Sequence, residues 1–465
     1  MARKPDRRSF GGGSRDIQGG NRVRLVAFRA LRRVSAEAGY ANLVVADVLR
    51  ETGLTGKDAA AVTDMVSAAC RWQGTLDRII AAAAGRELST LQPAVVDVLR
   101  LGAVLWAEST PAHAVVSEMV TLARNAIGER VSGLVNAVMR RVVGKPIPEW
   151  LAELSAGMDM LDALSVRHAH PRWIVAVFAE LLPANELEAA LNADNIPPVP
   201  TLVARPGLIA RDALLAAGGG APTAYSPYGV TRPGNPAELS PVRIGWAGVQ
   251  DEGSQLVTLA AVRAATAYPV SGPWLDMCAG PGGKAALLSG LAAEQGRTLL
   301  ANELQPHRAR LVAQALRGYP GGTHLVVTAD ARTAPWRESS FALTVADAPC
   351  SGLGALRRRP DSRWRREPKS ISELSELQRD LMESAVRATA PGGVVAWITC
   401  SPHPDETAAI VNHAAAIHGL TLLDAPSFLP EVPDAAAASD SRFVQLWPHR
   451  HGTDAMFLAL AVKPH

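Results

Sequence analysis

The sequence has little of several residue types that mark whole classes of protein. It contains 4 cysteines and 5% aromatic residues in a chain of 465. The cysteines are too few and too dispersed for a disulfide framework, and no CxxC pair indicates zinc. No apolar run approaches the about 18 residues that a membrane helix needs, and the N-terminus lacks the apolar core of a signal peptide. We therefore expect a cytoplasmic protein with reduced thiols, without a metal site and without a membrane anchor.

The net charge of +3 is small, but the basic residues are unevenly spread. Residues 1–21 are rich in Arg, Gly and Ser, and we expect a disordered basic tail there. A second cluster, "ALRRRPDSRWRRE", holds six arginines between Arg357 and Arg366. Such a run is usually a solvated face of a protein. Its place directly after Cys350 favours contacts with the phosphates of a substrate instead.

The remaining chain divides by its hydrophobic pattern. Residues 22–145 carry apolar positions at spacings of three and four, which predicts an all-α domain. Residues 146–160 break this pattern and are expected to be a linker, and residues 161–245 are expected to form a small α+β subdomain. In residues 246–465 strands alternate with helices, which predicts an α/β domain with a doubly wound parallel sheet. We expect its strands in "PWLDMCAG", "RTLLANEL", "THLVVTADA", "FALTVADAPC" and "GGVVAWITC".

Polar side chains stand where these strands end. Ligands of such sheets collect at the carboxyl ends of the strands, so one crevice should hold the polar residues found there. They are Asp276, Glu303, Asp330, Asp347, Cys350 and Cys400.

The stretch "DMCAGPGGK" follows a strand and opens a helix, so its backbone can approach a bound ligand closely. A P-loop is excluded, because Cys278 and Ala285 occupy positions where it requires a glycine and a hydroxyl residue. An acid for a ribose follows at Glu303, which suits NAD and S-adenosylmethionine equally. Asp330 favours S-adenosylmethionine, because an acid ending the third strand could meet the amine of adenine.

Two of the cysteines are poorly explained as packing. Cys70 lies in a helical pattern and fits a buried position, whereas Cys350 and Cys400 each follow a strand and precede a turn. One chemistry needs two such thiols. A thiolate that adds to C6 of a cytosine makes C5 nucleophilic toward a methyl sulfonium, and a second group must then assist proton removal and release.

The motifs "DMCAGPGGK", "ADAPCSGLGALRRRPDSRW" and "ITCSPHPDE" resemble those of the RNA cytosine-5 methyltransferases that use S-adenosylmethionine. The helical segments "PAVVDVLRLGAVLW", "PAHAVVSEMVTLAR" and "GLVNAVMRR" resemble the NusB-like RNA-binding domain of the RsmB (Sun/Fmu) type of 16S ribosomal RNA methyltransferase. The resemblance implies an all-α NusB-like domain, then a small α+β subdomain and an α/β Rossmann-like methyltransferase domain. It also implies S-adenosylmethionine as cofactor and RNA of the small ribosomal subunit as substrate, and we expect a monomer.

The resemblance further implies roles for single residues. Cys400 matches the nucleophile of the family, Cys350 the cysteine linked to product release, and Asp347 lies between cofactor and cytosine. Glu303 would bind the ribose and Asp330 the adenine side. The glycine loop would supply the rest of the cofactor site with Cys278, Ala279, Gly280, Pro281, Gly282, Gly283 and Lys284.

Three positions depart from the family pattern. Gly280 stands where many relatives carry alanine, which the backbone should tolerate. Glu303 stands where aspartate is more usual, which lengthens the side chain but keeps its carboxylate. Ala455 replaces a common glycine.

Two other functions stay open on the sequence. One is an NAD-dependent oxidoreductase, and the other is a noncatalytic RNA-binding protein with a vestigial methyltransferase fold.

Overall fold

The computed structural model describes residues 19–37, 39–333 and 335–465. Most of the expected basic tail, residues 1–21, lies outside this range. The chain divides into two compact units, residues 1–169 and 170–465. Within the described ranges no helix has the length and apolar character to cross a lipid bilayer.

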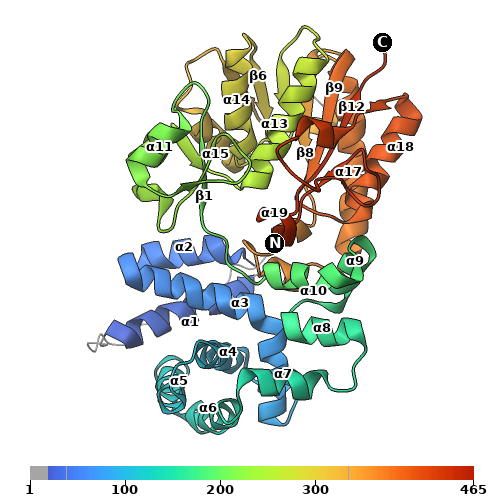
Figure 1. The fold of residues 1–465 in the computed structure, drawn as a ribbon. Coiled ribbons are helices and arrows are strands. Elements are labelled where there is room, and N and C mark those ends of the chain that lie inside the picture. Colours follow the sequence, from blue (N-terminus) through green and yellow to red (C-terminus); the bar gives the residue numbers. More distant parts are fainter. Residues whose placement is uncertain (1–18, 38, 334) are drawn as a thin grey trace, which may run out of the picture. The chain divides into compact units, whose positions relative to one another are not determined.

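The described part of the first unit is built from α-helices joined by short turns (Figure 1). Helix α3 (Gly56–Ala84) is followed by Gly85, and the left-handed conformation of Gly85 lets its N–H reach the carbonyls of Ala81 and Ala82. The helices are α1 (Gly19–Glu37), α2 (Ala41–Thr52), α3 (Gly56–Ala84), α4 (Pro93–Ala107), α5 (Ala112–Ala126), α6 (Glu129–Val142), α7 (Ile147–Ser155) and α8 (Met160–His168).

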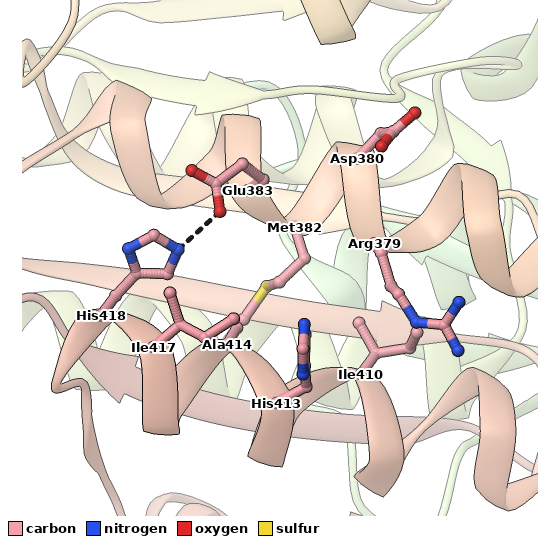
Figure 2. A pocket seen from close by; sticks show the side chains of 9 residues that line it. All are labelled: Arg379, Asp380, Met382, Glu383, Ile410, His413, Ala414, Ile417 and His418. Carbon is pink, nitrogen blue, oxygen red and sulfur yellow. Dashed lines mark hydrogen bonds and ion pairs between the residues drawn. The ribbon is translucent and has the colours of Figure 1, made fainter.

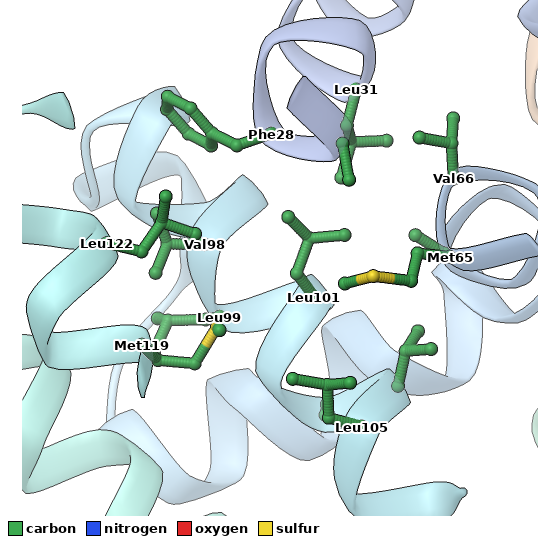
Figure 3. Packing of buried hydrophobic residues seen from close by; sticks show 14 of the residues in the cluster. Phe28, Leu31, Met65, Val66, Val98, Leu99, Leu101, Leu105, Met119 and Leu122 are labelled. Atoms are coloured by element: carbon green, nitrogen blue, oxygen red, sulfur yellow. The ribbon is translucent and has the colours of Figure 1, made fainter. Parts of the chain in front are cut away.

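Helix α4 forms the centre of this unit. It begins with Pro93, which suits the first turn of a helix, and it is apolar on nearly all sides. Figure 3 shows Leu99, Leu101 and Leu105 of α4 among apolar side chains of neighbouring helices, including Met119. A helix buried on all sides needs partners around it, and α1, α3, α5 and α6 all contact α4.

The segment that we expected to be a linker, residues 146–160, contains helix α7. Trp150 of α7 is buried and donates its indole N–H to the carbonyl of Val142 at 3.0 Å. The prolines that suggested a break instead stand at the beginning of the helix, where proline is well tolerated. The helical unit therefore continues past residue 146.

The second unit opens with helices α9 (Arg172–Leu181) and α10 (Ala184–Ala193) and a small antiparallel sheet. This sheet has the order β2-β3-β1-β4. Its strands are β1 (Thr201–Ala204), β2 (Ala221–Pro222), β3 (Gly229–Thr231) and β4 (Ala247–Val249), and its helices are α11 (Arg211–Gly218) and α12 (Ser240–Ile244).

The large sheet of the second unit has the order β10-β12-β9-β8-β5-β6-β7, and β11 pairs with β12. Its strands are β5 (Trp274–Asp276), β6 (Leu299–Asn302), β7 (His324–Val327), β8 (Phe341–Asp347), β9 (Thr389–Thr399), β10 (Thr421–Leu422), β11 (Val444–Gln445) and β12 (Phe457–Val462).

The five strands β5 to β9 coincide with the five predicted segments and are parallel. The predicted parallel strands are thus confirmed, and the sheet is extended by β12, which pairs antiparallel with β9 and with β10 and β11. The domain is thus Rossmann-like with a mixed sheet.

Helices cover both faces of the large sheet (Figure 1). On β9, Ala396 and Ile398 pack into one core with α13 (Glu252–Ala267), α14 (Gly283–Glu294) and α15 (Pro306–Leu316). Val395 and Trp397 point the other way, into a core with α17 (Pro368–Ala388) and α18 (Ala408–His418). This alternation follows from the two-residue period of a strand. Two short helices, α16 (Ser362–Arg365) and α19 (Pro448–His451), lie in the connections.

The strand order reverses beside β5. The chain runs from β5 outward through β6 to β7, and then crosses back to β8, which pairs with the other side of β5. In open α/β sheets the ligand crevice lies at such a reversal, at the carboxyl ends of the strands.

Candidate active site

The glycine loop joins the end of β5 to α14 at this reversal. Gly282 has a φ of +111°, and a Cβ added there would lie 2.6 Å from the Cβ of Ala315 in α15. Only glycine allows both the backbone conformation and the close approach. The loop therefore brings the N-terminus of α14, with its unpaired N–H groups, to the end of β5.

Lys284 at the beginning of α14 links this loop to β8. Its Nζ donates a hydrogen bond to Oδ2 of Asp347 at 2.9 Å, and both side chains are largely buried. Burial alone would lower the pKa of Lys284, but the Asp347 carboxylate outweighs burial and leaves that pKa raised. A salt bridge thus joins the ends of β5 and β8.

Asp276, the last residue of β5, is within electrostatic reach of this salt bridge. Its side chain is fully buried, and neither oxygen accepts a hydrogen bond of regular geometry from the described residues. Burial, followed by the negative charge of Asp347, raises the pKa of Asp276 to about 8. The site therefore holds a buried carboxyl group available to a hydrogen-bond donor.

Glu303 follows β6 and lies against the glycine loop. Its Oε2 accepts the N–H of Gly280 at 3.1 Å, and its Oε1 accepts the N–H of Gln305 at 2.9 Å. Arg308 of α15 contacts both partners: Nη1 lies 3.5 Å from Oε2 of Glu303, and Nη2 donates to the carbonyl of Gly280 at 2.6 Å. A Cβ at position 280 would lie 2.0 Å from Oε2 of Glu303. The glutamate in this conformation therefore requires glycine at position 280.

Asp330 lies three residues past the end of β7. Arg332 binds its carboxylate through Nε at 3.0 Å and Nη2 at 2.7 Å, and these bonds lower the pKa of Asp330. Asn302, which the sequence did not single out, ties this segment to the loop, because its Nδ2 donates to the carbonyls of Met277 and Ala329. Charge effects link Asp276 with Asp347 and Glu303, and Asp347 with the two cysteines, whereas Asp330 pairs with its neighbour Arg332.

The two cysteines meet at the ends of β8 and β9. Sγ of Cys350 lies 3.4 Å from Sγ of Cys400, and the backbone stays paired beyond the strands, with Gly354 N–H donating to the carbonyl of Cys400 at 2.8 Å. Each side chain is partly exposed, whereas Cys70 is buried in α3 and packs as predicted. The chain thus brings two thiols, 50 residues apart in sequence, into contact.

The two thiols differ in acidity. The hydrogen bond from Cys350 lowers the pKa of Cys400, against burial and Asp347 and with the help of Arg359 and Lys284. The same hydrogen bond, together with burial, raises the pKa of Cys350 well above its ordinary value. The shifts thus make Cys400 the more acidic thiol of the pair and Cys350 the less acidic one.

Half of the arginines between Arg357 and Arg366 are structural, which corrects the prediction that this run serves phosphates as a whole. Arg357 and Arg358 bind the buried carboxylates of Asp251 and Asp454, with Nη2 of Arg357 2.8 Å from Asp251 and its Nε 2.7 Å from Asp454. Arg363 is fully buried, and its Nη1 donates to Oδ1 of Asn195 at 2.9 Å.

The other three arginines lie nearer the surface. Arg365 pairs with Asp361 at 3.3 Å, and Arg366 donates to the carbonyl of Ser351 at 3.1 Å. Arg359 is exposed, and its charge acts on Cys400. Arg359 is therefore the arginine of this run best placed to meet a ligand at the cysteines.

A separate groove lies between α17 and α18 (Figure 2). Its lining contains none of the predicted site residues, and its charged groups include Arg379, Glu383 and His418, the last two joined at 2.5 Å. No cluster of His, Cys, Asp and Glu in the described ranges has the form of a metal site.

Residues 268–461 match the family described as 16S rRNA methyltransferase RsmB/F, and residues 21–144 match the NusB family. The chain is 45% identical over 447 residues to a putative methyltransferase of Mycobacterium tuberculosis, covering 94% of this chain and 95% of the relative. It is 32% identical to ribosomal RNA small subunit methyltransferase B of Pseudomonas putida, covering 84% of this chain and 88% of the relative.

Among solved structures, that of PH0851 superposes with a TM-score of 0.78 at 20% identity, covering 97% of this chain and all of the other. The structure of NSun6 from Pyrococcus horikoshii with SFG superposes with a TM-score of 0.55 at 16% identity, covering 64% of this chain and 99% of the other. At these identities the likeness shows the fold.

The paired arginines yield a stability test. Arg357→Ala should lower the free energy of unfolding by about 3 kcal/mol, because it removes one cation from two buried carboxylates while Arg358 remains beside them. Urea unfolding followed by tryptophan fluorescence measures this change. Arg379→Ala, an exposed arginine on α17, is the matched control and should stay within about 0.5 kcal/mol of the unsubstituted protein. Equal midpoints for both variants would show that the Arg357 contacts do not stabilise the fold.

Proposed function

Because the chain belongs to the RsmB/F family of 16S rRNA methyltransferases, we propose that it transfers a methyl group from S-adenosylmethionine to C5 of a cytosine in small-subunit ribosomal RNA. The reaction proceeds through a covalent bond between Cys400 and C6 of the base. RNA bases with such chemistry are taken out of their stack to reach the protein.

The observation that carries this proposal is the 3.4 Å contact between the thiols of Cys350 and Cys400. C5 of cytosine is a weak nucleophile, and addition of a thiolate to C6 makes it an enamine carbon that can attack a methyl group. Cys400 has the lowered pKa that a thiolate needs. C5 and C6 are neighbouring atoms, so a group beside Cys400 also lies near C5.

Cys350 supports the second half of the reaction. After methylation the C5 proton must leave and the Cys400 sulfur must be expelled, which requires an acid/base group. The hydrogen bond to the Cys400 thiolate is the largest cause of the raised pKa of Cys350. Once Cys400 is bonded to carbon this cause is gone, and Cys350 becomes more acidic at the stage where a base is needed.

The residues around the glycine loop fit S-adenosylmethionine, which supplies an electrophilic methyl group when bound. Glu303 would offer its carboxylate to the ribose hydroxyls and Asp330 its carboxylate to the adenine side, and the buried carboxyl group of Asp276 would be available to the ammonium group of the cofactor. The loop from Cys278 to Lys284 lines the site. Asp347 lies between loop and thiols, since Lys284 binds it and its charge acts on Cys400.

The same loop and Glu303 would also accept NAD, so these residues do not separate the two cofactors. The thiol pair supports S-adenosylmethionine, because the methyl transfer proposed here gives each of the two thiols a step. A vestigial, noncatalytic fold would likewise have no need of two thiols held in contact with opposite shifts in pKa. A titration with S-adenosylmethionine and with NAD distinguishes the alternatives.

Substitutions of the two cysteines should affect different steps of the reaction. Cys400→Ala should lower methyl transfer by at least about a thousandfold while RNA and cofactor still bind, because the thiolate serves only the chemistry. Cys350→Ala should accumulate protein bonded to RNA, seen as a band that survives denaturing electrophoresis and is absent from the double variant. An adduct that requires Cys350 and persists without Cys400 would show that Cys350 is the nucleophile. Full activity of both single variants would show that neither thiol takes part in the reaction.

The steric relation between Gly280 and Glu303 predicts a paired effect on cofactor binding. Gly280→Ala should push the Glu303 carboxylate off the loop and weaken S-adenosylmethionine binding by about 1.5–3 kcal/mol, the range for a hydrogen bond to a charged group. Glu303→Asp in the same chain removes the clash, so the double variant should bind more tightly than Gly280→Ala alone. Calorimetry on the two single variants and the double variant measures this coupling. Strictly additive losses would show that the two positions act independently.

Arg359 predicts a salt-dependent effect. If it holds a phosphate of the RNA, Arg359→Ser should lower RNA affinity and reduce the slope of log affinity against log salt by about 0.7–0.9. Filter binding at several salt concentrations measures both. Arg379→Ser removes an exposed arginine on α17 and should leave the slope unchanged. The same slope in both variants would place the phosphate contacts elsewhere.

A further inference from the structure

The carboxylate of Glu406 is fully buried beside the two cysteines, at 0% exposure. It lies in the turn after β9, within "TCSPHPDE", and the roles proposed above do not involve it. Burying a carboxylate is unfavourable unless donors surround it. Its partners therefore indicate what it holds in place.

Four donors point at its two oxygens. Oε1 accepts the N–H of Ser351 at 2.7 Å and Nε2 of Gln378 at 3.2 Å. Oε2 accepts the hydroxyl of Ser351 at 2.5 Å and the hydroxyl of Ser401 at 2.6 Å. The two serine oxygens lie 3.0 Å apart, and each has one hydrogen to give, so an acceptor satisfies both at once.

These donors adjoin the two cysteines in sequence. Ser351 follows Cys350, and Ser401 follows Cys400. Gln378 of α17 also donates to the carbonyl of Pro349 at 2.8 Å, on the other side of Cys350. The network therefore holds the backbone before and after Cys350 and fastens it to the residue after Cys400.

We propose that Glu406 is a positioning residue that sets the contact between Cys350 and Cys400 by joining the turns that carry them. The inference rests on the proposed function, because the contact matters only if the two thiols act in sequence. Backbone pairing between β8 and β9 brings the two turns together before the cysteines. After Cys350 the backbone is paired again by the hydrogen bond from Gly354 N–H to the carbonyl of Cys400. Glu406 fixes the intervening turn, which has no strand pairing of its own.

The charges around the thiols agree with this role. The negative charge of Glu406, with that of Asp347, disfavours ionisation of Cys350 after the effects of Cys400 and of burial. Asp347 raises the pKa of Cys400, while the cations Arg359 and Lys284 lower it. The charge of Glu406 thus adds a smaller contribution to the raised pKa of Cys350, and its main role is to hold the turn.

Two substitutions of similar length separate hydrogen bonding from packing. In Glu406→Gln the amide oxygen can accept from Ser351 N–H and Gln378, and its NH₂ can donate to both serine hydroxyls. Glu406→Met fills the same space without any of these bonds. We expect Glu406→Gln to keep kcat within about threefold and Glu406→Met to lower kcat by about a hundredfold, with unchanged KM for RNA and unchanged S-adenosylmethionine affinity.

A second readout does not require methyl transfer. The rate of Cys400 alkylation by iodoacetamide as a function of pH, followed by peptide mass spectrometry, reports the thiolate. In Glu406→Met, Cys400 should lose its hydrogen bond with Cys350, so the alkylation rate of Cys400 should rise at higher pH than in the unsubstituted protein. Asp405→Asn, an exposed neighbour in the same turn, is the matched control and should keep the profile of the unsubstituted protein.

The outcomes are distinct. If Glu406→Met does not fold, Ser351→Ala and Ser401→Ala each remove one donor, and each should lower kcat by about tenfold. If Glu406→Met folds and shows a normal kcat and a normal alkylation profile, the positioning role is overturned. If Glu406→Met does not fold, the same normal values in both serine variants overturn it. A shifted alkylation profile in a protein that never methylates RNA supports the positioning role and refutes the proposed function instead.

Discussion

The pairing of β8 with β9 is the constraint on which the site depends. The strands are parallel, with Asp347 opposite Ile398, so their carboxyl ends leave the sheet at the same level. Neighbouring strands lie about 4.8 Å apart, close enough for side chains just beyond their ends to touch. A slip by one residue would turn the buried side chains of β9 to the wrong face and separate the cysteines. The hydrophobic cores on both faces thus fix the distance between two reactive groups.

The strand reversal adds the second half of the site. Because β5 pairs with β8, the glycine loop begins beside the strand that leads to Cys350. Lys284, at the end of this loop, binds Asp347 at the end of β8. The hydrogen bond between the thiols and the cations Arg359 and Lys284 lower the pKa of Cys400. The same hydrogen bond, burial, Glu406 and Asp347 raise the pKa of Cys350. Two chemically identical side chains acquire different acidities from their surroundings alone.

The sequence predicted the parts of this arrangement that depend on local pattern. Each strand from β5 to β9 is an apolar run that ends in polar or turn residues, so both the strands and their ends were visible. Features set by distant partners were not. The run from Arg357 to Arg366 looks uniformly basic, but Arg357 is committed to Asp251 and Asp454, which lie about a hundred positions away in either direction. Glu406 looked like one more turn residue, because its donors come from three separate segments.

The same limit explains the two departures at the cofactor loop. Taken singly, glycine in place of alanine at position 280 looks neutral, and glutamate in place of aspartate at position 303 looks like a longer reach. In the folded chain a Cβ on Gly280 would lie 2.0 Å from Oε2 of Glu303, so the longer carboxylate occupies the volume of the missing methyl group. Arg308 contacts both residues, at the carbonyl of Gly280 and at Oε2 of Glu303. The departures are therefore sterically linked, because the observed conformation of Glu303 leaves no room for a Cβ at position 280.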